Sequence, residues 1–199
     1  MNIDDVEEVR VEGDVLKAIF ARQRNLMNKY HVIEEKSGIG YALVTGDLFD
    51  INNQKWQYLC KDFAWRITEE LTEACEAYAK NDFHHAKEEL SDALHFATEL
   101  CLICKIYPEE IGKFEDLFRE PCVWWQPVYH LGLAMNCLKL KPWKQTHVLT
   151  DSVKYKNHVI DAYRKLLGCA VLLKSNKEEF PLYYFKKAEV NAFRQRSNY

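Results

Sequence analysis

Residues 65–80, WRITEELTEACEAYAK, are followed directly by residues 81–100, NDFHHAKEELSDALHFATEL. In both segments the apolar residues recur at intervals of three and four, which is the period of an amphipathic helix. Asn81-Asp82 lies between them and is a typical N-cap signal. We therefore expect two consecutive helices, the first from Asn52 or Asn53 to about Lys80 and the next ending at Tyr107-Pro108.

The same periodicity extends over most of the chain. Further helices are expected at about 13–36, 108–119, 128–140, 151–173 and from 175 to the end near 199, with a loop at 38–53. Ser175-Asn-Lys-Glu178 has the form of a capping box for the last helix, and Pro181 is expected to kink or restart that helix. No repeat or interdomain linker separates these segments. The sequence therefore predicts an all-α helix bundle, one domain over residues 1–199.

The composition is that of a globular protein without a nucleic-acid-binding surface. The 199 residues are 48% hydrophobic and 29% charged, with a formal net charge of −3. A nucleic-acid-binding surface would need a basic excess, and no apolar run approaches the roughly 20 residues that span a bilayer. The N-terminus, MNIDDVEEVR, is acidic where a targeting signal would be basic. We expect an intracellular, cytoplasmic protein that binds neither nucleic acid nor membranes.

Seven cysteines are scattered along the chain, an odd number that does not suit a disulfide framework. Cys101 and Cys104 have the spacing of half a zinc site, but there is no second pair with this spacing. The pair also lies within an apolar helical run. Buried, reduced thiols in a reducing compartment are therefore expected.

Acidic residues on a helix usually form a solvated face, and the helical phase separates this possibility from a buried site. At roughly 100° per residue, Glu69 and Glu76 lie opposite the apolar stripe of residues 63–78 and are expected on the surface. Glu70 and Glu73 instead lie together along one edge of that stripe.

The following helix repeats this arrangement. Glu89 falls within its apolar arc and Asp92 at the border of that arc, again three residues apart. Four carboxylates are thus directed toward the groove between two packed helices, where repulsion and desolvation would cost several kcal/mol without a cation. A hard divalent ion, Mg²⁺ or Mn²⁺, suits such oxygen ligands. A di-iron site is the alternative, with Asp92-Ala-Leu-His95 as the nearest analogue of a Glu-x-x-His pair.

The two acidic pairs resemble the signature of the all-α nucleoside-triphosphate pyrophosphatases. This superfamily includes the MazG proteins, the dimeric dUTPases and the phage dCTP/dUTP pyrophosphatases. Glu69-Glu70-Leu-Thr-Glu73 and Glu89-Leu-Ser-Asp92 look most like MazG, whereas Asp92-Ala-Leu-His95-Phe96 looks like the D-I-x-H-F stretch of dimeric dUTPases. The tryptophan- and lysine-rich stretch that dimeric dUTPases carry between the two motifs is missing here.

The C-terminal residues 184–199 are similar to the Y-x-x-K-N-x-x-N-x-x-R-Q-x-x-G-Y motif of dimeric dUTPases and phage dCTP/dUTP pyrophosphatases. Two positions depart from it, because Ala188 replaces Asn and Asn198 replaces Gly. Independently of the resemblance, one polar stripe of a helix carries Lys187, Asn191, Arg194 and Asn198. Two cations and two amides in line suit a polyphosphate and a sugar hydroxyl, with a solvated basic face as the alternative.

Two further polar residues lie where apolar ones are expected. Gln23 is in the middle of the apolar stripe of the first helix, and a buried glutamine must have its hydrogen bonds met. By the resemblance to dimeric dUTPases, in which a glutamine of the first helix reads the base, Gln23 is the candidate for that role. A structural hydrogen bond to a neighbouring helix is the alternative. Lys139 and Trp143 belong to a segment that could form a lid over the phosphates, or else a surface lysine and a core tryptophan.

The resemblance implies a fold of the MazG and dimeric dUTPase type, a homodimer, and a location in the host cytoplasm if the source is viral. It also implies Mg²⁺-dependent hydrolysis, with Mn²⁺ as a substitute, of a (deoxy)nucleoside triphosphate to the monophosphate and pyrophosphate, with dUTP or dCTP first. Glu70 would orient the attacking water. The implied metal ligands are Glu70, Glu73, Glu89 and Asp92. The implied substrate-binding residues are Gln23, Lys139, Lys187, Asn191, Arg194, Gln195 and Tyr199. A MazG-like purine or broad-specificity enzyme, and a non-catalytic regulator that binds nucleotide or metal, are the alternatives.

Overall fold

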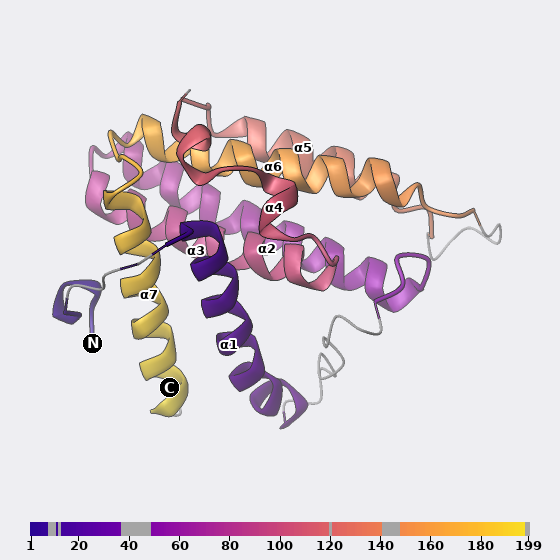
Figure 1. The fold of residues 1–199 in the computed structure, drawn as a ribbon, viewed down its shortest axis with the longest axis horizontal. Coiled ribbons are helices and arrows are strands. Elements are labelled where there is room, and N and C mark those ends of the chain that lie inside the picture. Colours follow the sequence, from indigo (N-terminus) through magenta and orange to yellow (C-terminus); the bar gives the residue numbers. More distant parts are fainter. Residues whose placement is uncertain (8–10, 12, 37–48, 120, 141–147, 198–199) are drawn as a thin grey trace.

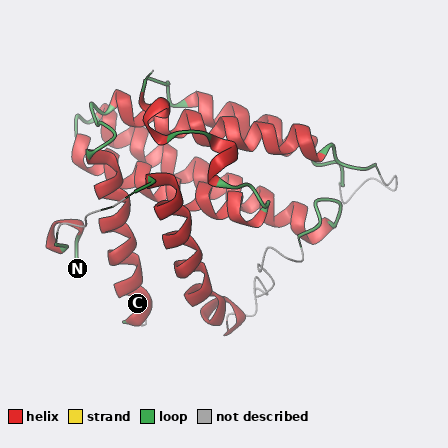
Figure 2. Cartoon of the chain, in the orientation of Figure 1, coloured by secondary structure: helices red, strands yellow, loops and turns green. Residues whose placement is uncertain are grey.

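The computed structural model describes residues 1–7, 11, 13–36, 49–119, 121–140 and 148–197, with the backbone alone at 29–36. Every regular element in this part of the chain is a helix (Figure 1, Figure 2). In chain order the elements are η1 (Ile3–Asp5), α1 (Val15–Lys36), α2 (Gln54–Ala79), α3 (Phe83–Ile103), α4 (Pro108–Ile111), η3 (Phe114–Phe118), α5 (Trp125–Cys137), α6 (Ser152–Leu172) and α7 (Glu179–Arg196). The expected all-α fold is confirmed.

Three pairs of neighbouring helices build the molecule (Figure 1). α2 and α3 run antiparallel through the middle, and α5 and α6 form a second antiparallel pair along them. α1 and α7 lie side by side and cross α3. The central helix is α3, which packs against α1, α2, α6 and α7. Any side chain that α3 presents to α2 or α7 is therefore held inside the bundle.

Side-chain caps begin three helices where the sequence predicts them. The caps of α2, α3 and α6 are Asn53, Asp82 and Asp151. In each case a side-chain oxygen of the cap accepts a backbone N–H of the first turn. Asn81, between α2 and α3, has a φ of 62°, in the left-handed region that asparagine tolerates. The chain therefore reverses within a few residues, and the two acidic pairs are brought face to face.

The start of α7 differs from the prediction. Asn176 is the cap, because its Oδ1 accepts the backbone N–H groups of Glu178 and Glu179 at 3.0 and 2.7 Å. The predicted capping box at Ser175 is therefore wrong, and the Ser175 hydroxyl donates instead to the Glu179 carboxylate. Pro181 lies in the first turn of α7, and the helix continues through it to Arg196. The helix is therefore not restarted at Pro181.

Other boundaries also differ from the prediction, and the helix expected at about 128–140 is α5, Trp125–Cys137. The helix expected to reach Tyr107-Pro108 ends at Ile103, because Lys105 has a φ of 53° and the Ile106 N–H bonds back to the Cys101 carbonyl at 2.9 Å. This is a Schellman-type closure. The segment expected to be helical at 108–119 is divided into α4 and η3.

The cysteines are free, and all except Cys75 are buried. Cys104 Sγ lies 3.9 Å from Cys60 Sγ, and none of the metal-ligand groups within the described residues includes a thiol. Burial is therefore as expected for six of the seven thiols. Across the described residues, no helix is both long enough and apolar enough to cross a membrane.

Candidate metal and phosphate site

Three of the four predicted carboxylates come together between α2 and α3. Glu70 and Glu73 on α2 and Glu89 on α3 each offer a carboxylate oxygen, and these oxygens lie within 4.8 Å of one another. Glu89 is buried, Glu70 is half-buried and Glu73 is exposed, so the group runs from the helix interface to the surface. The two antiparallel helices thus gather a set of hard oxygen donors at one place.

The pKa of Glu70 shows that negative charge accumulates at this site. Burial, and then the neighbouring Asp92, Glu89 and Glu73 carboxylates, raise the pKa of Glu70 from 4.5 to about 8. A carboxyl group with such a pKa is mostly protonated at neutral pH. A divalent cation at the group would offset the repulsion, so the donor set fits Mg²⁺ or Mn²⁺.

Asp92 lies beside this group and is bound to α7. Its Oδ2 accepts from the Lys187 Nζ at 2.8 Å, and Asn191 also donates to its side chain. Burial raises the pKa of Asp92, whereas the Lys187 ammonium and the Asn191 amide counteract the rise. The Asp92 charge in turn contributes to the raised pKa of Glu70. The acidic groove and the C-terminal motif are therefore joined through one ion pair.

The remaining residues of the C-terminal motif lie further along α7. Arg194 is exposed, and Gln195 is half-buried, with both amide atoms inaccessible and without a hydrogen-bond partner. Ala188 is fully buried in a small cluster with Leu26 of α1 and Ala192. Ala188, which replaces the asparagine of the family motif, therefore packs in the contact between α1 and α7. Residues 198 and 199 lie outside the described residues, so the predicted substrate contact of Tyr199 stays a prediction.

Gln23 is at the centre of a buried polar network. Only 1% of its side chain is exposed, and its Nε2 donates to Glu99 Oε1 at 2.6 Å. Its Oε1 accepts from the Tyr184 hydroxyl at 2.9 Å and lies 2.6 Å from His95 Nδ1. These contacts are those of the structural alternative, a hydrogen bond to neighbouring helices. The role in base reading stays a prediction.

His95 takes part in that network and lies apart from the metal-ligand groups described. Its ring stacks on Tyr184 at 4.1 Å between centroids, and burial lowers its pKa to about 3. The three-carboxylate group contains no histidine. For the di-iron alternative, His95 was the nearest candidate for an imidazole ligand, and it belongs to none of the metal-ligand groups among the described residues.

Lys139 lies far from the carboxylates within its own chain. It is exposed, and its Nζ donates to the Asn136 carbonyl at 3.1 Å. The next residue, Leu140, bonds through its N–H to Gln57 near the start of α2. Glu70 is thirteen residues further along that helix, about 20 Å at 1.5 Å per residue. Trp143 and the rest of the predicted lid fall at 141–147, outside the described residues.

The surface residues behave as the helical phase predicts. Glu69 is exposed and accepts from the Trp65 indole N–H at 2.7 Å, and Glu76 is exposed and paired with Lys80. Sequence reasoning missed His85, whose Nδ1 lies 3.3 Å from Glu89 Oε1. The four-residue interval between them was the available signal. It also missed Glu99, which follows Asp92 and His95 on one face of α3.

A comparison with protein families agrees with this geometry. A family model described as dUTPase (dUTPase_2) matches residues 65–199, about two thirds of the chain. The match includes both acidic pairs and the C-terminal motif, and Gln23 precedes it. Searches of curated proteins and of solved structures gave no match. The chain therefore belongs to the all-α dUTPase family, whose activity is of the nucleotide pyrophosphatase type.

Proposed function

We propose that the protein is a Mg²⁺-dependent pyrophosphohydrolase that converts dUTP or dCTP to the monophosphate and pyrophosphate. The observation that carries this proposal is the junction of the carboxylate group on α2 and α3 with the buried Lys187 of α7, through Asp92. Anionic ligands for a cation and a cationic group for a phosphate lie next to each other there. The C-terminal motif favours a pyrimidine deoxynucleotide by its resemblance.

Glu70, Glu73 and Glu89 would hold Mg²⁺, with Asp92 as a fourth ligand. Bound Mg²⁺ supplies charge neutralisation at phosphate oxygens and activation of water. Glu70 is the residue that orients the attacking water and accepts its proton. Its half-buried position between two other carboxylates favours this role, because a raised pKa makes a carboxylate a better proton acceptor once it is ionised.

Lys187, Asn191 and Arg194 would bind the phosphates and the sugar. The Lys187 ammonium has three donors and uses one on Asp92, so two remain for phosphate oxygens. Arg194 is exposed about two turns further on and offers a planar fork for bidentate contact. Gln195 and Tyr199 complete the proposed set by the family motif, and Gln23 stands as the candidate for base contact.

The proposal includes a homodimer in the cytoplasm. Trp65 of α2 and Trp125 and Tyr129 of α5 are exposed, at 63%, 61% and 49% of their surface. A second copy could cover such aromatic groups. Lys139 follows α5 and precedes Leu140, which is bonded to Gln57 at the start of α2, about 20 Å along that helix from Glu70. Its substrate role is therefore proposed only for the dimer, in which it would serve the site of the partner subunit.

Turnover of the five nucleotides dUTP, dCTP, dTTP, dATP and dGTP with Mg²⁺ tests the proposal. We expect monophosphate and pyrophosphate in equal amounts, fastest from dUTP or dCTP, and no turnover with EDTA. A purine preference would favour the MazG-like alternative, which the missing tryptophan- and lysine-rich stretch supports. Nucleotide binding without turnover would refute the enzymatic proposal and favour the non-catalytic regulator.

A further inference from the structure

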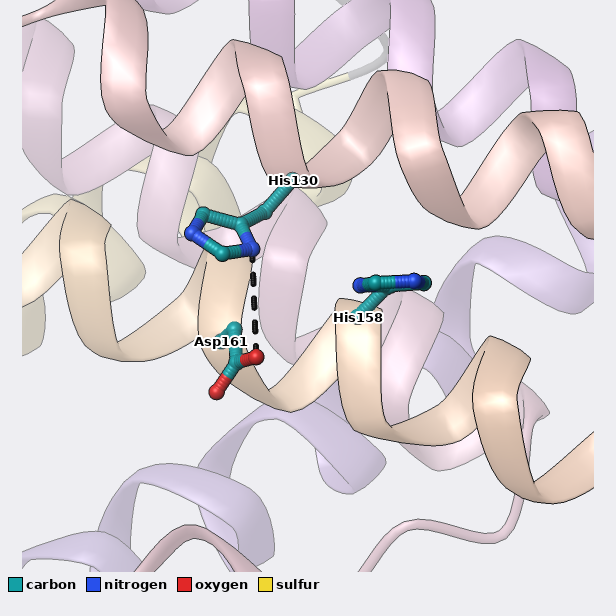
Figure 3. A group of neighbouring side chains, drawn as sticks. All are labelled: His130, His158 and Asp161. Atoms are coloured by element: carbon teal, nitrogen blue, oxygen red, sulfur yellow. Dashed lines mark ion pairs between the residues drawn. The ribbon is translucent and has the colours of Figure 1, made fainter.

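Among the described residues, α3 carries another candidate group, His85, Glu88 and Glu89, which shares Glu89 with the three carboxylates. A separate group of metal-ligand side chains lies between α5 and α6. It consists of His130 on α5 and of His158 and Asp161 on α6, one turn apart (Figure 3). One nitrogen or oxygen atom from each lies within 4.8 Å of the others, and all three residues are half-buried. The acidic group described above lies instead between α2 and α3, so the two groups are on different helix pairs.

The polar atoms of this group lack the hydrogen bonds that would explain their position. Nδ1 of His130 and Nδ1 of His158 are both buried without a hydrogen-bond partner. His130 Nδ1 faces Asp161 Oδ2 at 3.8 Å, which is too long for a hydrogen bond. Buried imidazole nitrogens are normally satisfied by a donor, an acceptor or a metal ion.

The spacing of the atoms suits a small metal ion. With metal–ligand bonds of about 2.0–2.1 Å in a tetrahedral arrangement, neighbouring ligand atoms are about 3.3 Å apart. Atoms already within 4.8 Å need only small side-chain rotations to reach that separation. The other Asp161 oxygen, Oδ1, lies 3.5 Å from Arg164 Nη1, and this ion pair helps to orient the carboxylate.

The ligand chemistry selects the class of metal. Two imidazoles and one carboxylate favour divalent transition metals over Mg²⁺, which prefers oxygen alone. We infer that His130, His158 and Asp161 form a second metal site, for a divalent transition metal ion such as Zn²⁺, which links α5 to α6.

Zinc titration of the full chain by calorimetry, with excess Mg²⁺ to occupy the carboxylates of α2 and α3, tests this site. We expect one equivalent of Zn²⁺ to bind. His158→Ala and His158→Gln should each weaken binding by at least about a hundredfold, because losing a direct ligand costs more than the roughly 10–100-fold lost with a residue that only orients a ligand. Zn²⁺ at a hundred times its Kd should raise the Tm of the parent by roughly 5–10 °C. The two variants should show no such rise.

Two controls separate this site from the rest of the molecule. Asn157→Ala changes the exposed neighbour of His158 and should leave zinc affinity unchanged. His85→Ala removes the imidazole beside Glu89, and should also leave it unchanged. Zinc binding that survives in the His158 variants, that is lost in the His85 variant, or that is missing from the parent would overturn the inference.

Discussion

Replacing Glu70 by glutamine should stabilise the protein when no metal is present. Glu70 has a pKa raised to about 8 in the folded state, because it is partly buried beside three other carboxylates. The folded protein therefore binds its proton more tightly than the unfolded chain does, and the stability of the parent falls as the pH rises from 4.5 to about 8. Glu70→Gln removes this loss and keeps the side-chain volume.

The size of the gain follows from the two pKa values. A rise from 4.5 to about 8 corresponds to about 5 kcal/mol at about 1.4 kcal/mol for each tenfold change in proton affinity. Solvent screens a half-buried group, so we expect about 2 kcal/mol above pH 8. Below pH 4.5 both states are protonated and the gain should vanish. For a chain of this size, about 2 kcal/mol raises the Tm by roughly 4–8 °C.

Urea unfolding in EDTA at pH 4.5, 6.5 and 8.5 measures the difference between variant and parent. Glu69→Gln is the matched control, since Glu69 is exposed on the opposite face, and its effect should stay within about 0.5 kcal/mol at every pH. Added Mg²⁺ should stabilise the parent more than the variant. A Glu70→Gln protein that is less stable than the parent at pH 8.5 without metal would refute the reasoning.

Three further substitutions, with Glu76→Gln as a control, test the rest of the site. Glu73→Gln should lower kcat/KM by at least about a hundredfold, whereas Glu76→Gln, on the solvated face, should change it by less than about twofold in the same pyrophosphate assay. Arg194→Ala should cost about 1.5–3 kcal/mol in kcat/KM, because a hydrogen bond to a charged phosphate is lost, and the Tm should be unchanged. A fully active variant would show that Arg194 does not bind the phosphates. Gln23→Ala should cost about 1–3 kcal/mol in urea unfolding, because Glu99 loses a buried partner, and a changed ranking of nucleotides would add base reading to its structural role.

The sequence by itself determined the helices and the direction in which their side chains point. Periodicity gave the phase that places Glu70 and Glu73 at the groove and Glu69 and Glu76 in solvent. This works because helical phase is a local property, set by 100° per residue. The starts of α2, α3 and α6 were also predicted, because an N-cap depends on a side chain two or three residues from the N–H it accepts. At the start of α7 the prediction placed the cap at Ser175, whereas the Asn176 side chain accepts the backbone N–H groups there.

Only the tertiary structure decided which distant residues meet. Asp92 shares a face with Glu89 and was predicted as an equal metal ligand, but α7 crosses α3 there and Lys187 pairs with it. The partner of Gln23, Glu99, lies 76 positions away, and His130 meets His158 only because α5 and α6 pack side by side. Such contacts depend on how whole helices cross, which is set by the packing of many apolar side chains at once and leaves no short-range pattern in the sequence.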